Sequence, residues 1–245
     1  MARKRRKSSP SKETKKRGVT RERFRTSPAF EGSRQAASEF GKASQCAVLL
    51  RRELAQVLEL VRENELHLRL SQKIGGLMRE KRLSGSPVAS LNAQPWNKLE
   101  GLKFNEKASL DNLLEGRQEV TVSPASGKIN IRLTGFGLDD KYDARKAGTH
   151  YRIVACASAI DFTKKKAISD YTATGHLPIV RPVKEHYTQA PVELSLTLPA
   201  PVILPLFVAL GMVCYSFDKG AFTMLGNRSF KALELIYARP SAIAS

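Results

Sequence analysis

Apolar residues between positions 33 and 62 recur at alternating steps of three and four, which is the spacing of one face of an amphipathic helix. The positions are Phe40, Ala43, Ala47, Leu50, Leu54, Val57 and Val61. A second stripe consists of Leu66, Leu70, Ile74 and Leu77. It follows Asn64, a residue type that favours helix N-caps. The pattern therefore predicts a helical hairpin, or one kinked long helix, with a buried apolar face.

Beyond about residue 96 the helical period gives way to the two-residue period of strands. Val120 and Val122 alternate with polar residues before the turn sequence at 124–127, and Ile129 and Ile131 do so after it. This arrangement predicts a hairpin with one apolar face. Further strands are predicted over 151–160, 171–177, 192–198, 204–217 and 230–237. About seven strands favour an antiparallel sandwich, because no helix-length pattern separates them as a parallel sheet requires.

The chain is therefore expected to have three parts. The parts are a disordered basic arm over 1–32, a helical segment over 33–95 and a β-sandwich domain over 96–239. A connector rich in Ser, Gly and Pro covers 84–98, around the boundary between the last two parts. Trp96 within it is expected to pack against the fold, because an exposed lone Trp is unusual. The predicted fold class is α+β, with an N-terminal helical hairpin followed by an antiparallel β-sandwich that is immunoglobulin-like or jelly-roll-like.

An uncharged run from 194 to 217 is long enough to span a bilayer. Pro199, Pro201 and Pro205 would interrupt a helix there, and the earlier part of the run alternates like a strand. Buried strands are therefore predicted, with no transmembrane segment. Basic residues at the N-terminus are not followed by an apolar stretch, so no secretory signal peptide is expected. The expected location is cytoplasmic, or within an assembled particle.

Positive charge is concentrated at the start of the chain. The net charge is +18 at pH 7, and residues 1–34 contribute +10 of it, from 13 Lys and Arg against 3 Asp and Glu. Apolar residues are too sparse there to offset the entropy of ordering. Clustered cations displace counterions from phosphates, so the arm is expected to bind DNA or RNA through the backbone, with a solubilising tail or membrane-surface binding as alternatives. The predicted contact residues are Arg3, Lys4, Arg5, Arg6, Lys7, Lys12, Lys15, Lys16, Arg17, Arg21, Arg23 and Arg25.

The helical segment holds more basic residues, which can extend a binding face. They are Arg51, Arg52, Arg62, Arg69, Lys73, Arg79, Lys81 and Arg82. Acidic residues are interspersed among them at Glu53, Glu59, Glu63, Glu65 and Glu80. Because these can pair at helical spacing, a solvated helix face is the favoured interpretation.

Metal and cofactor sites are not predicted. Cys46, Cys156 and Cys214 are widely separated and are predicted to be buried free thiols. The histidines are His67, His150, His176 and His186, and they lack the spacing of a metal site. The acidic cluster Asp139, Asp140 and Asp143 lacks the ligand series of a calcium loop. No nucleophile elbow, phosphate-binding glycine loop or zincin helix occurs, so no catalytic residues are assigned and the chain is expected not to be an enzyme.

Several segments resemble a family of uncharacterised proteins of about this length that is widespread in Bacteroidetes genomes. The matching segments are SPAF at 27–30, SEFGKA at 38–43, LLR at 49–51, LEGLKFN at 99–105, AGTHYRIVACASAIDF at 147–162, PLFVALGMVCY at 205–215 and SFKALELI at 229–236. The resemblance covers 27–237 and implies a helix-then-sandwich organisation and a bacterial source. It implies no activity. At its start the family shows a glycine-rich, strand-like segment, whereas this chain has the polybasic arm, which is therefore particular to this member.

These observations predict a non-enzymatic structural protein that binds nucleic acid non-specifically through the arm and self-associates as a homo-oligomer. One alternative is a subunit of a self-assembling particle or filament, such as a phage or virion coat or tail component. In that case apolar runs such as 202–213 would serve partly as interfaces, because a long uncharged strand is an association hazard unless covered. A second alternative is a small-ligand-binding or enzymatic β-sandwich with a pocket.

Overall fold

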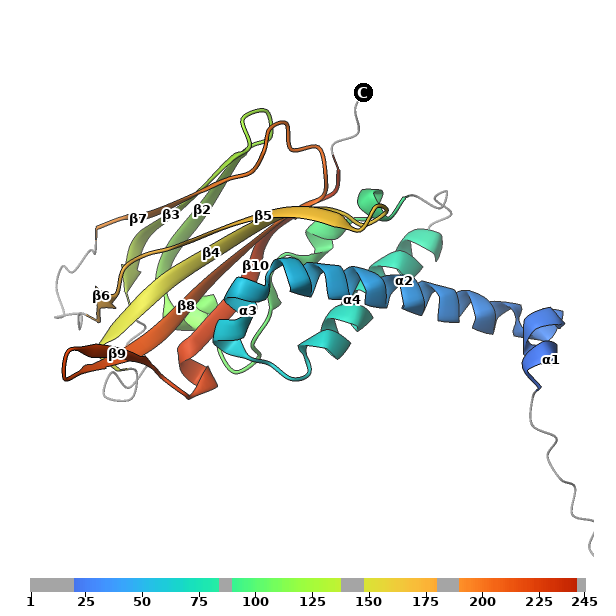
Figure 1. Cartoon of the computed structure of the whole chain (residues 1–245), viewed down its shortest axis with the longest axis horizontal. Coiled ribbons are helices and arrows are strands. Elements are labelled where there is room, and N and C mark those ends of the chain that lie inside the picture. Colours follow the sequence, from blue (N-terminus) through green and yellow to red (C-terminus); the bar gives the residue numbers. More distant parts are fainter. Residues whose placement is uncertain (1–19, 84–89, 138–147, 180–189, 242–245) are drawn as a thin grey trace, which may run out of the picture. The chain divides into compact units, whose positions relative to one another are not determined.

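Helices precede two antiparallel sheets in the computed structural model, which describes residues 20–83, 90–137, 148–179 and 190–241 (Figure 1). The main helices are α2 (Glu31–Glu53), α3 (Ala55–Val61) and α4 (Leu66–Leu83). The short elements η2 (Leu91–Ala93), η3 (Trp96–Leu99) and α5 (Leu110–Leu113) lead into and accompany the sheets. The α+β class is therefore confirmed.

The chain divides into two units, Met1–Ser38 and Glu39–Ser245. The second unit contains α2 from Glu39 onward, α3, α4 and both sheets. The helical and strand-rich parts, which change period near residue 95 in the sequence, thus share one unit.

The helix predicted over 33–62 is interrupted at Leu54. This residue has φ −95° and ψ 11°, and α3 turns away from the axis of α2 (Figure 1). Arg62 ends α3 in the left-handed conformation, with φ 42°. The next helix, α4, begins at Leu66, so the residue before it is Glu65 and not Asn64, the predicted cap. The Glu65 carbonyl accepts hydrogen bonds from the amides of Leu68 and Arg69, at 3.0 and 3.2 Å.

Phe40 does not belong to the buried stripe, although the sequence placed it there. Its side chain is 62% exposed, whereas Ala43, Ala47 and Leu50 are buried. Burial along α2 begins only at Ala43, because the helix packs on the rest of its unit from that residue onward.

The larger sheet has the order β1-β10-β8-β4-β5, with β6 paired to β4 and β9 paired to β8. Its strands are β1 (Leu102–Lys103), β4 (His150–Asp161), β5 (Lys166–Ala173), β6 (Leu177–Pro178), β8 (Leu206–Asp218), β9 (Ala221–Met224) and β10 (Lys231–Arg239). The smaller sheet, of order β2-β3-β7, contains β2 (Glu115–Ser123), β3 (Lys128–Gly137) and β7 (Val192–Thr197). The strand predicted over 171–177 is wrong in its bounds, because it combines the end of β5 with β6.

The predicted β2–β3 hairpin is confirmed. Ser123 pairs with Lys128 across the four-residue turn, and Gly127 has φ +70°. A side chain at this position would place its Cβ 1.9 Å from the Leu198 carbonyl oxygen, so the turn requires glycine.

A hydrophobic cluster lies between the two sheets. Alternate residues of β3 and β7, such as Ile131 and Leu196, are buried against alternate residues of β4 and β8, such as Ile153 and Leu210. Period-two alternation in each strand therefore points one set of side chains into this core.

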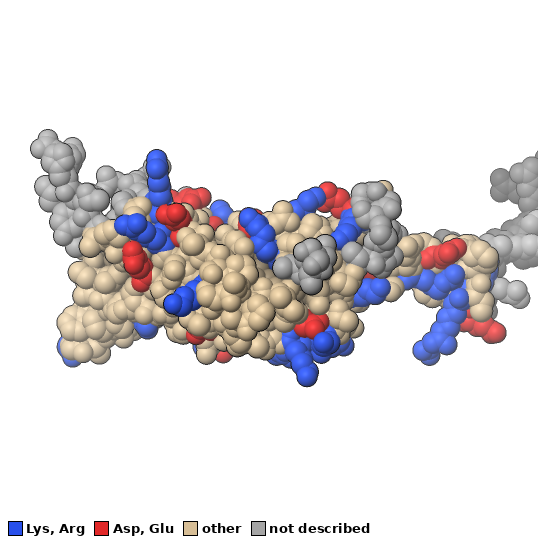
Figure 2. All heavy atoms as spheres, turned by 90° about the horizontal axis from the view of Figure 1, so that it is seen from above, with Lys and Arg blue, Asp and Glu red and all other residues tan. Residues whose placement is uncertain are grey.

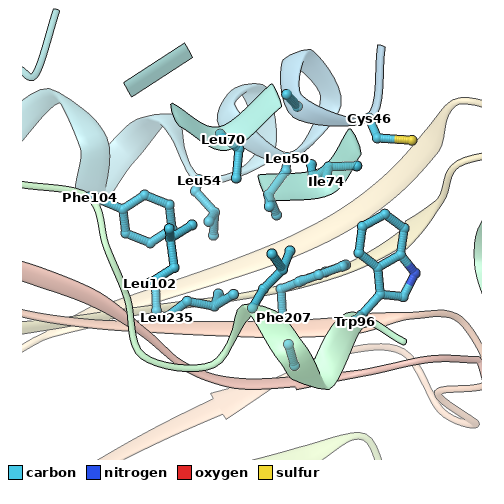
Figure 3. Packing of buried hydrophobic residues seen from close by; sticks show 14 of the residues in the cluster. Cys46, Leu50, Leu54, Leu70, Ile74, Trp96, Leu102, Phe104, Phe207 and Leu235 are labelled. Atoms are coloured by element: carbon cyan, nitrogen blue, oxygen red, sulfur yellow. The ribbon is translucent and has the colours of Figure 1, made fainter. Parts of the chain in front are cut away.

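A second cluster lies between the helices and the opposite face of the larger sheet. Leu50 and Leu70 from the helices lie towards Phe207 and Leu235 from the sheet (Figure 3). Trp96 joins this cluster fully buried, with its ring 4.6 Å from that of Phe162 and 5.5 Å from that of Phe207. The expected docking of Trp96 is confirmed.

The apolar run over 202–213 is internal, which corrects its predicted role as an interface. Strand β8 has β4 on one side and β10 on the other, and its residues from Leu206 to Val213 are all buried. Because both edges and both faces of this segment are covered within the chain, the predicted association hazard is removed. Only Ile203 of this run is largely exposed, at 56%.

Candidate nucleic-acid interface

The basic segment is helical over its described part, although the sequence predicted disorder over 1–32. Helix α1 (Arg21–Thr26) begins after Thr20, whose hydroxyl accepts a hydrogen bond from the Arg23 amide at 3.3 Å. Element η1 (Pro28–Phe30) follows directly. Sparse apolar residues suggested disorder, but an N-cap satisfies amides at the helix start without a hydrophobic core.

Arg34 fixes the turn that follows α1. Its Nη1 donates to the carbonyl oxygens of Phe24 and Ser27, at 2.8 and 2.9 Å. The rings of Phe24 and Phe30 lie 5.6 Å apart. This arginine is therefore engaged inside its own unit, and its guanidinium serves the local structure.

Arg21, Arg23 and Arg25 are exposed, in contrast to Arg34. Within the described residues their side chains have no hydrogen-bond or ion-pair partner. Arg21 and Arg25 are four residues apart and share a face of α1, while Arg23 lies on the other side. The three cations are thus available to a polyanion from two directions.

The remaining predicted contact residues lie outside the described residues. They are Arg3, Lys4, Arg5, Arg6, Lys7, Lys12, Lys15, Lys16 and Arg17.

Acidic residues of the helical segment pair more often than predicted with basic residues outside that segment. Glu63 pairs with Arg228 at 3.1 Å, and Glu80 pairs with Lys98. Glu53 pairs with its neighbour Arg52 at 2.8 Å. None of these three pairs has the helical spacing that was expected, because Arg228 lies in η4 (Arg228–Phe230), Lys98 lies in η3 and Arg52 is the direct neighbour of Glu53.

Lys and Arg are scattered among Asp and Glu over the face seen in Figure 2, without one continuous basic patch. A pocket of about 440 Å³ near α4 and η3 contains Arg69, Lys73 and Lys103. Arg69 is engaged there with Glu106 at 3.0 Å and with the carbonyl of Lys103 at 3.1 Å. Arg69 is therefore engaged, although the pocket as a whole is basic, because Lys98 and Glu100 also line it and its four cations face only two carboxylates.

A second pocket, of about 490 Å³, lies beside β5 and the segment after β7. Ile168 and Ile203 contribute apolar surface to it. Asp161 also borders the pocket, but its Oδ1 already accepts from Asn92 Nδ2 at 2.9 Å and from the amides of Thr163 and Lys164. This carboxylate is thus directed into the fold more than into the pocket.

The three cysteines are buried free thiols, as predicted. Burial raises the pKa of Cys46 and Cys214 to about 12, and it does the same for Cys156, where Asp170 and Glu53 add to the effect. These thiols therefore stay protonated and unreactive at neutral pH.

No group of three His, Cys, Asp or Glu side chains in the described part of the chain is arranged to hold a metal ion. His186 and the cluster Asp139, Asp140 and Asp143 lie outside that part.

His150 and His176, far apart in the sequence, both lie against Phe222. Their ring centroids are 5.0 and 3.8 Å from that of Phe222. Sequence reasoning missed this grouping, although the alternation Tyr215-x-Phe217 before a turn and Phe222 after it was a usable signal.

The fold defines an α+β protein with helices on one face of an antiparallel sheet and a smaller antiparallel sheet on the other. No family model, curated protein or solved structure matches this chain. Among the described residues, no helix combines the length and the apolar character needed to cross a membrane.

Proposed function

We propose that this chain is a non-enzymatic structural protein that binds nucleic acid without sequence preference through its basic N-terminal segment, and that self-associates. The observation that carries the proposal is the contrast between engaged and free cations. Arg34, Arg69 and Arg228 are held by carbonyl or carboxylate oxygens, whereas Arg21, Arg23 and Arg25 are exposed without a described partner.

Phosphate contact through counterion release is the mode that suits such a segment. Lys and Arg of residues 1–26 neutralise backbone phosphates, and the released counterions supply most of the binding free energy. The contact needs charge and reach, and it reads no base sequence. The partner is accordingly DNA or RNA, bound through its backbone.

Deleting residues 1–26 tests the proposal. The deletion is expected to abolish binding of labelled DNA and RNA in fluorescence anisotropy and to flatten the salt dependence that remains. A chain whose residues 1–26 are scrambled, with the same composition, is the control and should bind like the parent, because the contact depends on charge. Unchanged binding by the deletion variant refutes the assignment.

A particle or filament subunit is the second candidate. The side chains of Phe40 and Val48, two turns apart on α2, are 62% and 51% exposed. Large apolar side chains on one helix face are a common site of subunit contact. Size-exclusion chromatography with electron microscopy separates the candidates, because a monodisperse monomer contradicts the assembled form.

Three finer assignments belong to the same proposal. The two sheets form a sandwich of immunoglobulin-like or jelly-roll-like type. The chain is a member of the Bacteroidetes family that its segments resemble. It acts in the cytoplasm or within an assembled particle.

A further inference from the structure

Five rings gather at one end of the larger sheet and form what we call the aromatic cluster: His150, His176, Tyr215, Phe217 and Phe222. Phe217 and Phe222 lie 4.6 Å apart and are 45% and 41% exposed. His176 is stacked on Phe222 at 3.8 Å with an interplanar angle of 1°, and its edge contact with Tyr215 spans 4.7 Å. A group of exposed aromatic rings from neighbouring strands is unusual, because such side chains normally bury about 150–250 Å² each in a core or an interface.

Strand register places these rings on one face. Tyr215 pairs with His150, and Phe217 pairs with Phe222, so each pair points to the same side of the sheet. This is the face that the helices cover near Phe207 and Ala209, which belong to the helix-side core, whereas Tyr215 and Phe217 do not. In Figure 1 the end of β8 and all of β9 extend beyond α3. The aromatic cluster therefore occupies the part of the sheet that no described helix covers.

Two threonines hold the aromatic cluster in place. The Thr149 hydroxyl accepts from the Phe217 amide at 2.8 Å and lies 2.9 Å from His150 Nδ1. The Thr174 hydroxyl accepts from the Ile153 amide at 3.1 Å, which ties the segment before His176 to β4. The rings are thus preorganised, so a flat ligand can bind without ordering them first.

The charge around the aromatic cluster is positive. Arg152 follows His150 by two residues on the same face of β4, and its Nε donates to the Thr174 carbonyl at 3.0 Å. Lys219 is exposed in the turn between Phe217 and Phe222. Asp218 directly follows Phe217, so alternation directs it to the opposite face. Burial, followed by the charges of Arg152 and His150, lowers the pKa of His176.

We propose that the aromatic cluster is a stacking platform for unpaired nucleobases, with the exposed Lys219 placed to meet an adjoining phosphate. Aromatic faces bordered by cations are what single-stranded DNA or RNA requires, because every base has a π-face and every linkage a negative charge. The inference rests on the proposed function and deepens it: the basic segment supplies affinity for any polyanion, and the aromatic cluster adds a preference for single strands.

Substitution of both exposed rings tests the platform. The variant Phe217→Ala/Phe222→Ala should bind labelled oligo(dT) and oligo(U) of about 12 nucleotides roughly 5- to 150-fold more weakly than the parent, which corresponds to the loss of one stacked base. The slope of log affinity against log salt should stay unchanged, because no phosphate contact is removed. Binding of an abasic oligonucleotide and of a duplex should be the same for parent and variant.

Two controls keep the result interpretable. Ile203→Ala removes a comparably exposed apolar side chain from a separate pocket and should leave all binding unchanged. Phe217→Leu/Phe222→Leu keeps the apolar volume without the ring faces and should lose oligo(dT) affinity like the alanine variant, with the thermal unfolding midpoint of the parent.

The outcomes separate the two proposals. If the parent binds the abasic strand and the duplex in a salt-dependent manner but the alanine variant retains full oligo(dT) affinity, the platform alone is overturned. If that variant loses no nucleic-acid affinity but shifts to a smaller oligomer in sedimentation, the aromatic cluster is a subunit contact and the platform is again overturned. If the parent binds none of the probes, both proposals fall.

Discussion

Replacing Arg21, Arg23 and Arg25 by Gln tests the described part of the basic segment directly. Gln and Arg have similar helix propensities, so α1 should keep its structure while it loses three cations. Arg34 stays in place and continues to hold the carbonyls of Phe24 and Ser27. The substitution therefore removes charge and leaves the local fold intact.

The expected change can be worked out from the number of free arginines. Each phosphate contact contributes about 0.7 to the salt slope on a single strand and about 0.9 on a duplex. Losing three contacts should make the slope shallower by about 2 on single strands and about 3 on duplex DNA. Raising the salt concentration from 50 to 200 mM weakens the binding of both proteins. The fold-loss of affinity should be about 20 to 40 times smaller for the variant than for the parent.

Fluorescence anisotropy titrations at several salt concentrations measure this slope. The three-site change to Lys is one control and should retain the parent slope, because charge alone is needed. A second control replaces Lys164, Lys165 and Lys166 by Gln, which removes the same charge from an exposed turn of the second unit. A parent-like slope in the α1 variant, or an equal loss in the turn variant, would show that the free arginines of α1 do not contact phosphate.

Three further predictions concern stability and assembly. Trp96→Ala should lower the free energy of unfolding by about 3–5 kcal/mol, measured by urea unfolding followed by circular dichroism. Trp96→Phe should lower it clearly less, because the indole Nε1 is buried without a described hydrogen-bond partner and its loss breaks no hydrogen bond. Equal losses for the two variants would contradict this. Burial raises the pKa of Glu234 above its ordinary 4.5, so its ionisation opposes folding and stability falls as pH rises through the raised value. Glu234→Gln can still accept from the Leu110 amide. Its free energy of unfolding should therefore rise relative to that of the parent as the pH increases above 4.5, and a difference that is independent of pH would refute the assignment. Phe40→Glu should shift sedimentation velocity towards a smaller species if α2 joins subunits, while Gln45→Glu on the same helix should not; identical profiles for Phe40→Glu and the parent exclude this face.

The strands were the most predictable part of the fold. Period-two alternation fixed β3 and β7, because a one-residue slip would turn Ile131 or Leu196 out of the core. The charge-free run over 194–217 was correctly assigned to strands for the same reason. That most of the run over 202–213 is internal and not an interface was not predictable, since only the strand order shows that β4 and β10 cover β8.

Local features that override composition were harder to predict. The break at Leu54 leaves the apolar stripe intact, so periodicity alone does not reveal it. Helix α1 depends on the cap at Thr20 and on Arg34, which is more than ten residues further along. The aromatic cluster combines residues of β4, β8 and β9 with His176, and only their register brings these together.

The position of β10 also bears on how the protein is made. This strand, Lys231–Arg239, is the last described strand to be synthesised, yet it lies between β1 and β8, inside the larger sheet. Until it leaves the ribosome, β8 has one unpaired edge and the helix-side core lacks Leu233 and Leu235. Nascent chains therefore expose this apolar surface until β10 has been synthesised, and chaperone capture should be strongest for chains that stop just before residue 231.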